Sequence, residues 1–252
     1  MSYVYFRLPH STHVFRNRLS TEPEEIASLA ELNGRRGFVI APFAPSDDCP
    51  ILLLPTDWEE VDLNFSGDNQ NGEQTHLSST DGVSAMLLDA DYEEERQRYA
   101  VDFHNYHGQL TNDAFQKIVL ARCARLTATE KLSPLTLFAR ACHRYPRMFV
   151  VLFSTERSGT WLIATPETLI SGTDGAMQTM ALAGTMRLSG ANLDFDVEGG
   201  SIGKDDIRWS TKNIKEQRYV ETYITECVEQ FSDDVNVEGP FTVRAGDLVH
   251  LR

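Results

Sequence analysis

Apolar residues recur at helical spacing in several stretches of this sequence. In one stretch they lie four, three and four positions apart, which predicts a helix over about residues 91–109. These positions are Tyr99, Phe103, Tyr106 and Leu110. A Ser-Pro pair at residues 133–134 predicts the start of a second helix that runs to Pro146. A long helix is predicted over about residues 205–231, and a shorter one over residues 23–32.

Strands are predicted where apolar and β-branched residues form short or alternating runs. The run at residues 116–127 is β-rich, so its alternate side chains are expected on opposite faces of a strand. The other predicted strands cover residues 37–43, 51–54, 148–154, 161–164, 169–171, 177–183 and 241–252. Because several of the connections are short, neighbouring strands are expected to be antiparallel.

A polar segment rich in Gly, Asn and Ser divides the chain at residues 65–82. It holds too few apolar side chains to form a core, so we predict an exposed loop there. The chain is thus divided into residues 1–82, which end with this loop, and residues 83–252. The final run ends in LVHLR without a turn or polar tail, so we expect the C-terminal remainder of the fold to be absent.

The composition argues against several classes of partner. With 37 acidic and 23 basic residues the formal charge is −14, so no basic stripe is available for nucleic acid or an anionic membrane. The sequence has no apolar run of about eighteen residues and no secretory signal, which predicts a cytoplasmic protein. Its four cysteines lack metal-ligand spacing, which favours reduced thiols over disulfides or zinc.

Three short motifs combine residue types that could act on a small anion. They are KIVLAR at residues 117–122, ATPETL at residues 164–169 and ALAGT at residues 181–185. Lys117 precedes an apolar strand, where loss of water favours the uncharged amine and makes it a candidate base. On spacing alone, an ordinary surface charge is the more common outcome.

The other two motifs suggest an acid and an anion cradle. ATPETL is predicted to turn through Pro166 into a short helix with Glu167 in its first turn. In a closed pocket that carboxyl would keep its proton and act as an acid, whereas otherwise it is a helix-terminus charge. ALAGT has no bulky side chain, so Gly184 could let main-chain N–H groups approach a carboxylate. A tight turn in a packed sheet is the competing interpretation.

Together with KNIKEQRYV at residues 212–220, these motifs resemble in order and character those of the chorismate-utilising enzymes. The resemblance covers about residues 99–252. It implies an α+β fold in which large antiparallel sheets pack with helices outside, and of which this chain supplies only part. In that fold, residues 1–82 correspond to a variable N-terminal part of the sheet layer, and residues 83–252 to the first part of the chorismate-binding catalytic domain.

The resemblance also implies a role for each matching position. Lys117 corresponds to the base that activates water for attack at C2 of chorismate, and Glu167 to the acid that protonates the departing C4 hydroxyl. Glu216 corresponds to a ligand of Mg²⁺, the implied cofactor. The residues of the implied substrate-binding turn are Ala183, Gly184 and Thr185.

Two positions resemble one branch of the family, the isochorismate synthases of menaquinone or siderophore biosynthesis. Branches that deliver ammonia generally lack the lysine corresponding to Lys117, and aminodeoxychorismate synthases have a lysine nucleophile where this sequence has Ala183. Water is therefore the implied nucleophile and isochorismate the implied product. Gln217 departs from the family pattern, in which histidine commonly follows the metal-binding glutamate.

Two alternatives stay open at this point. Salicylate synthases resemble the chain at every position named and add elimination of pyruvate. A catalytically inactive fragment would keep the fold without turnover. In each case we expect chorismate as the small-molecule ligand, no nucleic-acid or membrane partner, and a monomer if the chain is complete.

Overall fold

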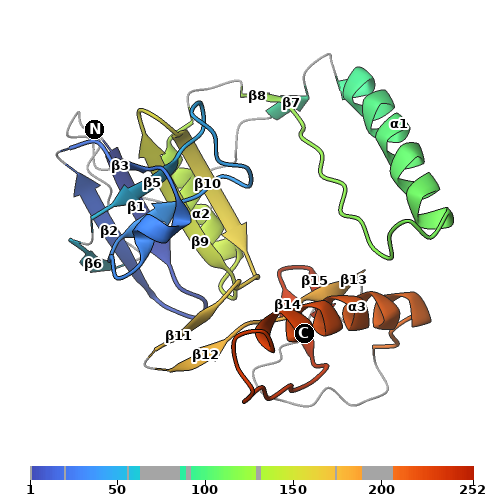
Figure 1. The fold of residues 1–252 in the computed structure, drawn as a ribbon. Coiled ribbons are helices and arrows are strands. Elements are labelled where there is room, and N and C mark those ends of the chain that lie inside the picture. The colour runs from blue at the N-terminus through green and yellow to red at the C-terminus, as the bar shows by residue number, and fades with distance from the viewer. Residues whose placement is uncertain are drawn as a thin grey trace. The chain divides into compact units, whose positions relative to one another are not determined.

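The computed structural model describes residues 2–19, 21–55, 57–62, 86–88, 92–128, 132–173, 175–188 and 207–252 (Figure 1). The chain forms two compact units, one of Met1–Thr80 with Leu132–Pro166 and one of Asp81–Lys131 with Glu167–Arg252. The first unit thus includes a segment that the sequence analysis assigned to the catalytic domain. The predicted polar loop at residues 65–82 lies outside the described residues, and the catalytic role of residues 83–252 stays a prediction.

The first unit is built on an antiparallel five-stranded sheet with the strand order β10-β9-β1-β2-β6. Its N-terminal strand β1 pairs with β9 from the middle of the chain, with Tyr5 opposite Leu152. The strands are β1 (Ser2–Arg7), β2 (His13–Leu19), β6 (Glu59–Asp62), β9 (Phe149–Thr155) and β10 (Gly159–Thr165).

The inner strands β1 and β9 have buried side chains on both faces of this sheet, whereas the edge strand β10 is mostly exposed. On one face, helix α2 (Pro134–Arg144) packs Phe138 and Cys142 against apolar side chains of the strands. Burial raises the pKa of the Cys142 thiol to about 11, so it packs as a protonated, largely apolar group. The other face packs against the small sheet β3-β5-β4. That sheet consists of β3 (Glu24–Ile26), β4 (Phe38–Ile40) and β5 (Ile51–Leu54).

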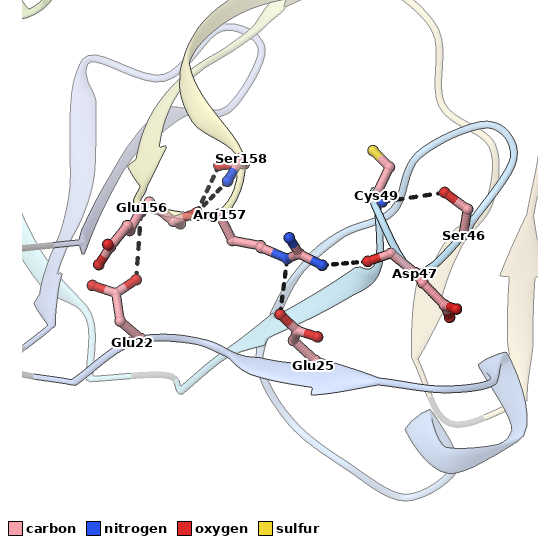
Figure 2. Close-up of polar contacts among 9 residues, drawn as sticks. Glu22, Glu25, Ser46, Asp47, Cys49, Glu156, Arg157 and Ser158 are labelled. Atoms are coloured by element: carbon pink, nitrogen blue, oxygen red, sulfur yellow. Dashed lines mark hydrogen bonds and ion pairs between the residues drawn. The ribbon is translucent and has the colours of Figure 1, made fainter.

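Polar contacts tie the β9–β10 turn to the N-terminal half of the first unit (Figure 2). Arg157 Nε lies 2.9 Å from Glu25 Oε1, and the same guanidinium donates to the carbonyl oxygen of Asp47. The neighbouring Glu156 N–H donates to the Glu22 carboxylate at 3.4 Å. The arginine–glutamate pair is partly exposed, so we expect it to fix the turn rather than to add much stability.

Within the described residues, the second unit holds two long helices and three small sheets. Strand β13 (Ala183–Arg187) pairs with β15 (Leu248–Leu251), which pairs with β14 (Thr242–Ala245). Helix α3 (Thr211–Val228) contacts β13 and β15. The remaining elements are β7 (Met86–Leu88), α1 (Tyr92–Thr111), β8 (Leu126–Ala128), β11 (Ser171–Thr173) and β12 (Ala176–Gln178). None of the helices in the described ranges is long and apolar enough to cross a membrane.

The three longer predicted helices are confirmed as α1, α2 and α3, within a few residues except at the start of α3. The predicted helix at residues 23–32 is wrong, since Glu24–Ile26 forms a strand that pairs with β5. This strand buries Ile26 against Ile51 and Leu53, and a short 3-10 helix follows it at Leu29–Leu32. Tertiary pairing there overrides local helix propensity.

Two predictions around the candidate motifs are also wrong. Residues 116–125 form no regular strand, and Val119 is 78% exposed. A strand needs a partner for its main-chain groups, and pairing in this part of the described chain begins only at Leu126, against β7. The short helix expected after Pro166 is absent as well, because residues 166–170 are irregular.

Candidate substrate site

Helix α3 brings most of the candidate residues of the second unit together. Its first turn is capped by Ser210, whose hydroxyl accepts a hydrogen bond from the Asn213 N–H at 3.1 Å. Asn213 and Gln217 lie one turn apart and are its buried residues. In sequence they extend the stripe that continues through Val220 and Ile224, so the buried face of the helix begins with two polar side chains.

The ALAGT motif enters β13 through an irregular step at Gly184. The register of β13 against β15 shifts between Ala183 and Thr185, and Gly184 has φ of 69°, where residues other than glycine are strained. A Cβ atom at Gly184 would lie 3.0 Å from the Asn213 carbonyl oxygen. This glycine is therefore required both by the backbone and by the close approach of α3. The sequence left open whether a ligand or packing within the fold makes such an approach, and in the structure Asn213 of α3 makes it.

Gln217 binds the main chain of the same motif with both ends of its side-chain amide. Its Nε2 donates to the Ala181 carbonyl oxygen at 2.7 Å, and its Oε1 accepts from the Ala183 N–H at 2.9 Å. The side chain is only 2% exposed. The sequence analysis noted Gln217 as a departure from the family but missed this function. Its place on the buried stripe of α3 was the available signal.

The neighbouring Glu216 faces the KIVLAR motif. Its Oε1 lies 3.5 Å from Lys117 Nζ, and the two side chains are 32% and 31% exposed. An ion pair with that exposure contributes roughly 0–1 kcal/mol to stability. Its importance is positional, since it joins the predicted base to the predicted metal ligand.

Glu216 is the carboxylate that the resemblance assigns to magnesium. Within the described residues, no group of three or more His, Cys, Asp or Glu side chains could hold a metal ion. Magnesium, however, is commonly bound by only one or two carboxylates, with water and substrate oxygens completing its shell. The partly exposed carboxylate of Glu216 fits that requirement as a single protein ligand, provided that the substrate supplies others.

Thr185, which follows Gly184 in β13, makes a separate contact. Its Oγ1 lies 3.0 Å from His250 Nδ1, which follows from the pairing of Thr185 with His250 across β13 and β15. Burial lowers the pKa of His250, and the negative charge of Glu167 partly opposes that effect. Glu167 therefore acts electrostatically on a residue bonded to the ALAGT motif.

His250 is a second residue that the sequence analysis missed. The alternation in LVHLR predicted its strand correctly, but strand pairing was needed to place its ring beside Thr185. The structure thus links Lys117 with Glu216, and Thr185 with His250 in the field of Glu167. That Lys117 and Glu167 act on one substrate stays a prediction.

Comparison with known proteins shows to which family the chain belongs. The model of the family described as "Chorismate binding enzyme" matches residues 56–252. The chain belongs to this family of chorismate-binding enzymes. No curated protein matches the chain.

Solved structures of this fold include two that are similar over nearly the whole chain. A protein of Bacillus anthracis, assigned as the 2,3-dihydroxybenzoate-specific isochorismate synthase DhbC, has a TM-score of 0.66 at 14% identity, covering 99% of this chain and 66% of its own. The menaquinone-specific isochorismate synthase MenF of Escherichia coli has a TM-score of 0.64 at 15% identity, covering 100% of this chain and 63% of its own.

These similarities confirm the predicted α+β class, with antiparallel sheets and packed helices. The chain spans slightly less than two thirds of the length of either solved protein. At such low identity they show a shared fold and leave the reaction to be established for this chain.

Proposed function

We propose that this protein is an isochorismate synthase that converts chorismate to isochorismate with the help of magnesium. The observation that supports it most is the arrangement around α3, where adjacent residues of one helix contact Lys117 and the ALAGT motif. The isochorismate synthases among the structural neighbours are consistent with the same reaction.

In this proposal Lys117 removes a proton from water as the oxygen bonds to C2 of the ring. The ring double bonds shift, the bond between C4 and its hydroxyl breaks, and the hydroxyl leaves as water with a proton from Glu167, whose carboxyl is protonated in the substrate complex in this proposal. One water enters and one leaves, so the overall reaction is an isomerisation. A lysine paired as an ammonium has no lone pair to accept a proton, so the 3.5 Å pair with Glu216 belongs to the protein without substrate.

The remaining residues bind and orient the ring. The main chain at Gly184 and the hydroxyl of Thr185 face the substrate in this proposal, and Ala183 has no amine that could replace water as the nucleophile. Magnesium bound at Glu216 would supply positive charge beside a substrate carboxylate. Such a charge is needed locally, because the protein has a formal charge of −14.

Incubation with chorismate and magnesium, followed by chromatography of the products, tests the proposal. Isochorismate as the accumulating product supports it. Salicylate with an equal amount of pyruvate would assign the protein to the salicylate synthases instead. Chorismate that remains unchanged, with magnesium in excess and the protein shown to be folded, would contradict any catalytic function for this chain.

A further inference from the structure

Gln217 is bonded to the main chain on both sides of Leu182. The amide spans from the Ala181 carbonyl oxygen to the Ala183 N–H, at 2.7 and 2.9 Å. With the side chain 2% exposed, water cannot readily replace either bond. Removing the amide would therefore leave the buried N–H of Ala183 and the partly buried carbonyl oxygen of Ala181 without this partner, which is costly.

These bonds fix the start of β13 against α3. Gly184 follows the bonded N–H directly, and one helical turn before Gln217 the main chain of Asn213 lies against Gly184. Glu216 immediately precedes Gln217 in α3, and its carboxylate pairs with Lys117. A change in the amide contact would thus move the glycine step relative to the Glu216 carboxylate.

We propose that Gln217 is a positioning residue that sets the main chain of ALAGT at the distance from Glu216 that the substrate requires. It acts through the strand and does not touch the substrate. The inference rests on the proposed function for its catalytic consequence. The contact itself can be tested independently of any reaction.

The chemistry of an amide suggests replacements with opposite pH responses. A protonated glutamic acid at position 217 can donate to Ala181 and accept from Ala183 as the amide does, but its carboxylate cannot donate. A neutral histidine has one donor and one acceptor nitrogen, whereas an imidazolium only donates and leaves the Ala183 N–H without an acceptor. The glutamine itself does not titrate in this range.

The experiment compares the parent protein with Gln217→Glu, Gln217→His and Gln217→Leu between about pH 5.5 and 8.5. Dividing kcat/KM for chorismate by the parent value at each pH removes the titration of other groups. We expect the ratio to fall with rising pH for Gln217→Glu and with falling pH for Gln217→His. Gln217→Leu should be reduced about 10- to 100-fold at every pH, as expected for a small misplacement.

Matched controls and a second readout separate positioning from general damage. Gln230, which is exposed and donates to the Glu226 carbonyl oxygen at 3.2 Å, receives the same three substitutions and should give pH-independent ratios. Hydrogen exchange of the Ala183 amide, referred to the parent protein at each pH, should accelerate with falling pH in the His variant, because an imidazolium cannot accept from this N–H. It should stay slow in the Glu variant, because both forms of the carboxyl accept, and should be fast at every pH in the Leu variant. An unchanged circular dichroism spectrum across the pH range excludes unfolding as the cause.

Ratios that do not change with pH, or unchanged protection of the Ala183 amide in all three variants, would overturn the inference. If the parent does not turn over chorismate, the proposed function fails and the exchange measurement still decides the contact. Loss of Ala183 protection at low pH in the His variant and at every pH in the Leu variant would then support a Gln217 that positions the strand, and unchanged protection in both would refute it.

Discussion

Different interactions stabilise the interior of each of the two compact units of this chain. All three clusters of buried apolar residues found among the described residues lie in the first unit, on β1, β2, β9, α2 and the small sheet. In the second unit α1 has no buried residue, and the buried residues of α3 are the polar Asn213 and Gln217. The candidate site residues lie in this second unit.

The difference indicates that apolar packing dominates in the first unit, whereas hydrogen bonds position the candidate residues in the second. Apolar burial stabilises the first unit without regard to direction, at about 25 cal/mol per Å². In the second unit, hydrogen bonds from side chains to the main chain fix specific distances at a smaller net gain, about 0.5–1.5 kcal/mol each. We therefore expect mutations in the two units to affect different measurements.

The largest effect is expected on catalysis. Lys117→Ala and Glu167→Gln should each reduce kcat for isochorismate formation by about 10²- to 10⁴-fold, because a proton-transfer group is lost. The free energy of unfolding should change little, since Lys117 contributes only a partly exposed ion pair. Steady-state kinetics and urea unfolding measure the two quantities.

Lys215→Ala and Glu229→Gln serve as controls for these variants, because both side chains are exposed on α3 or at its end. They should retain nearly the parent rate. A normal rate in Lys117→Ala would remove that lysine from the proposed mechanism, and the same holds for Glu167→Gln.

A substitution in the first unit should show the opposite pattern. Phe138 is 1% exposed beneath the five-stranded sheet, so Phe138→Ala should destabilise the unit by about 3–5 kcal/mol. Hydrogen exchange followed by mass spectrometry should show a larger acceleration of exchange, relative to the parent protein, in β1, β9 and α2 than in α3. Equal acceleration in both units would indicate that they unfold together and would weaken the comparison.

Gly184→Ala tests the irregular step in the second unit. The positive φ and the 3.0 Å approach of the Asn213 carbonyl oxygen predict a loss of about 1–3 kcal/mol, together with reduced substrate binding. Gly108→Ala is the matched control, because a Cβ there meets nothing within 4 Å and the residue lies inside α1. That control should be neutral or stabilising by up to about 1 kcal/mol. Similar outcomes for both glycines would argue against strain at Gly184.

The smallest effect is expected from the titration of His250. Burial lowers its pKa from the ordinary value of 6.5, so the unfolded chain binds a proton more readily than the folded one. This group's contribution is therefore complete above about pH 6.5 and is lost as the pH falls toward the folded-state pKa. In His250→Asn, unfolding free energies measured between about pH 5 and 8 should depend less on pH, whereas the exposed His104→Asn should behave as the parent. Parallel pH profiles in all three proteins would contradict this assignment.

The sequence predicted local features better than long-range ones. The three longer helices could be predicted from the apolar stripes of α1, α2 and α3 and from the Ser133–Pro134 helix start, because spacing and capping are local properties. The strand at residues 116–127 was wrong, since alternation does not reveal whether a partner strand is present. Gly37 was assigned only to a strand, yet a Cβ there would lie 2.6 Å from the Leu54 carbonyl oxygen, a contact that depends on sheet pairing.

The candidate site shows the same limit. Motif order suggested Lys117, Glu167, Gly184 and Glu216 as candidates, but gave no account of what holds them in place. The contacts made by Gln217 and His250 join residues 34 and 65 positions apart in the chain. Such contacts follow from the packing of α3 and β15 on β13, which no local pattern specifies.

The central claim is that water, activated by Lys117, replaces the C4 hydroxyl of chorismate with a new hydroxyl at C2. Turnover in water labelled with heavy oxygen tests it directly, with the position of the label found by mass spectrometry of the product. We predict isochorismate labelled at the C2 hydroxyl, and loss of this labelled product in Lys117→Ala. Isochorismate formed without label, or labelled equally well by Lys117→Ala, would contradict the account.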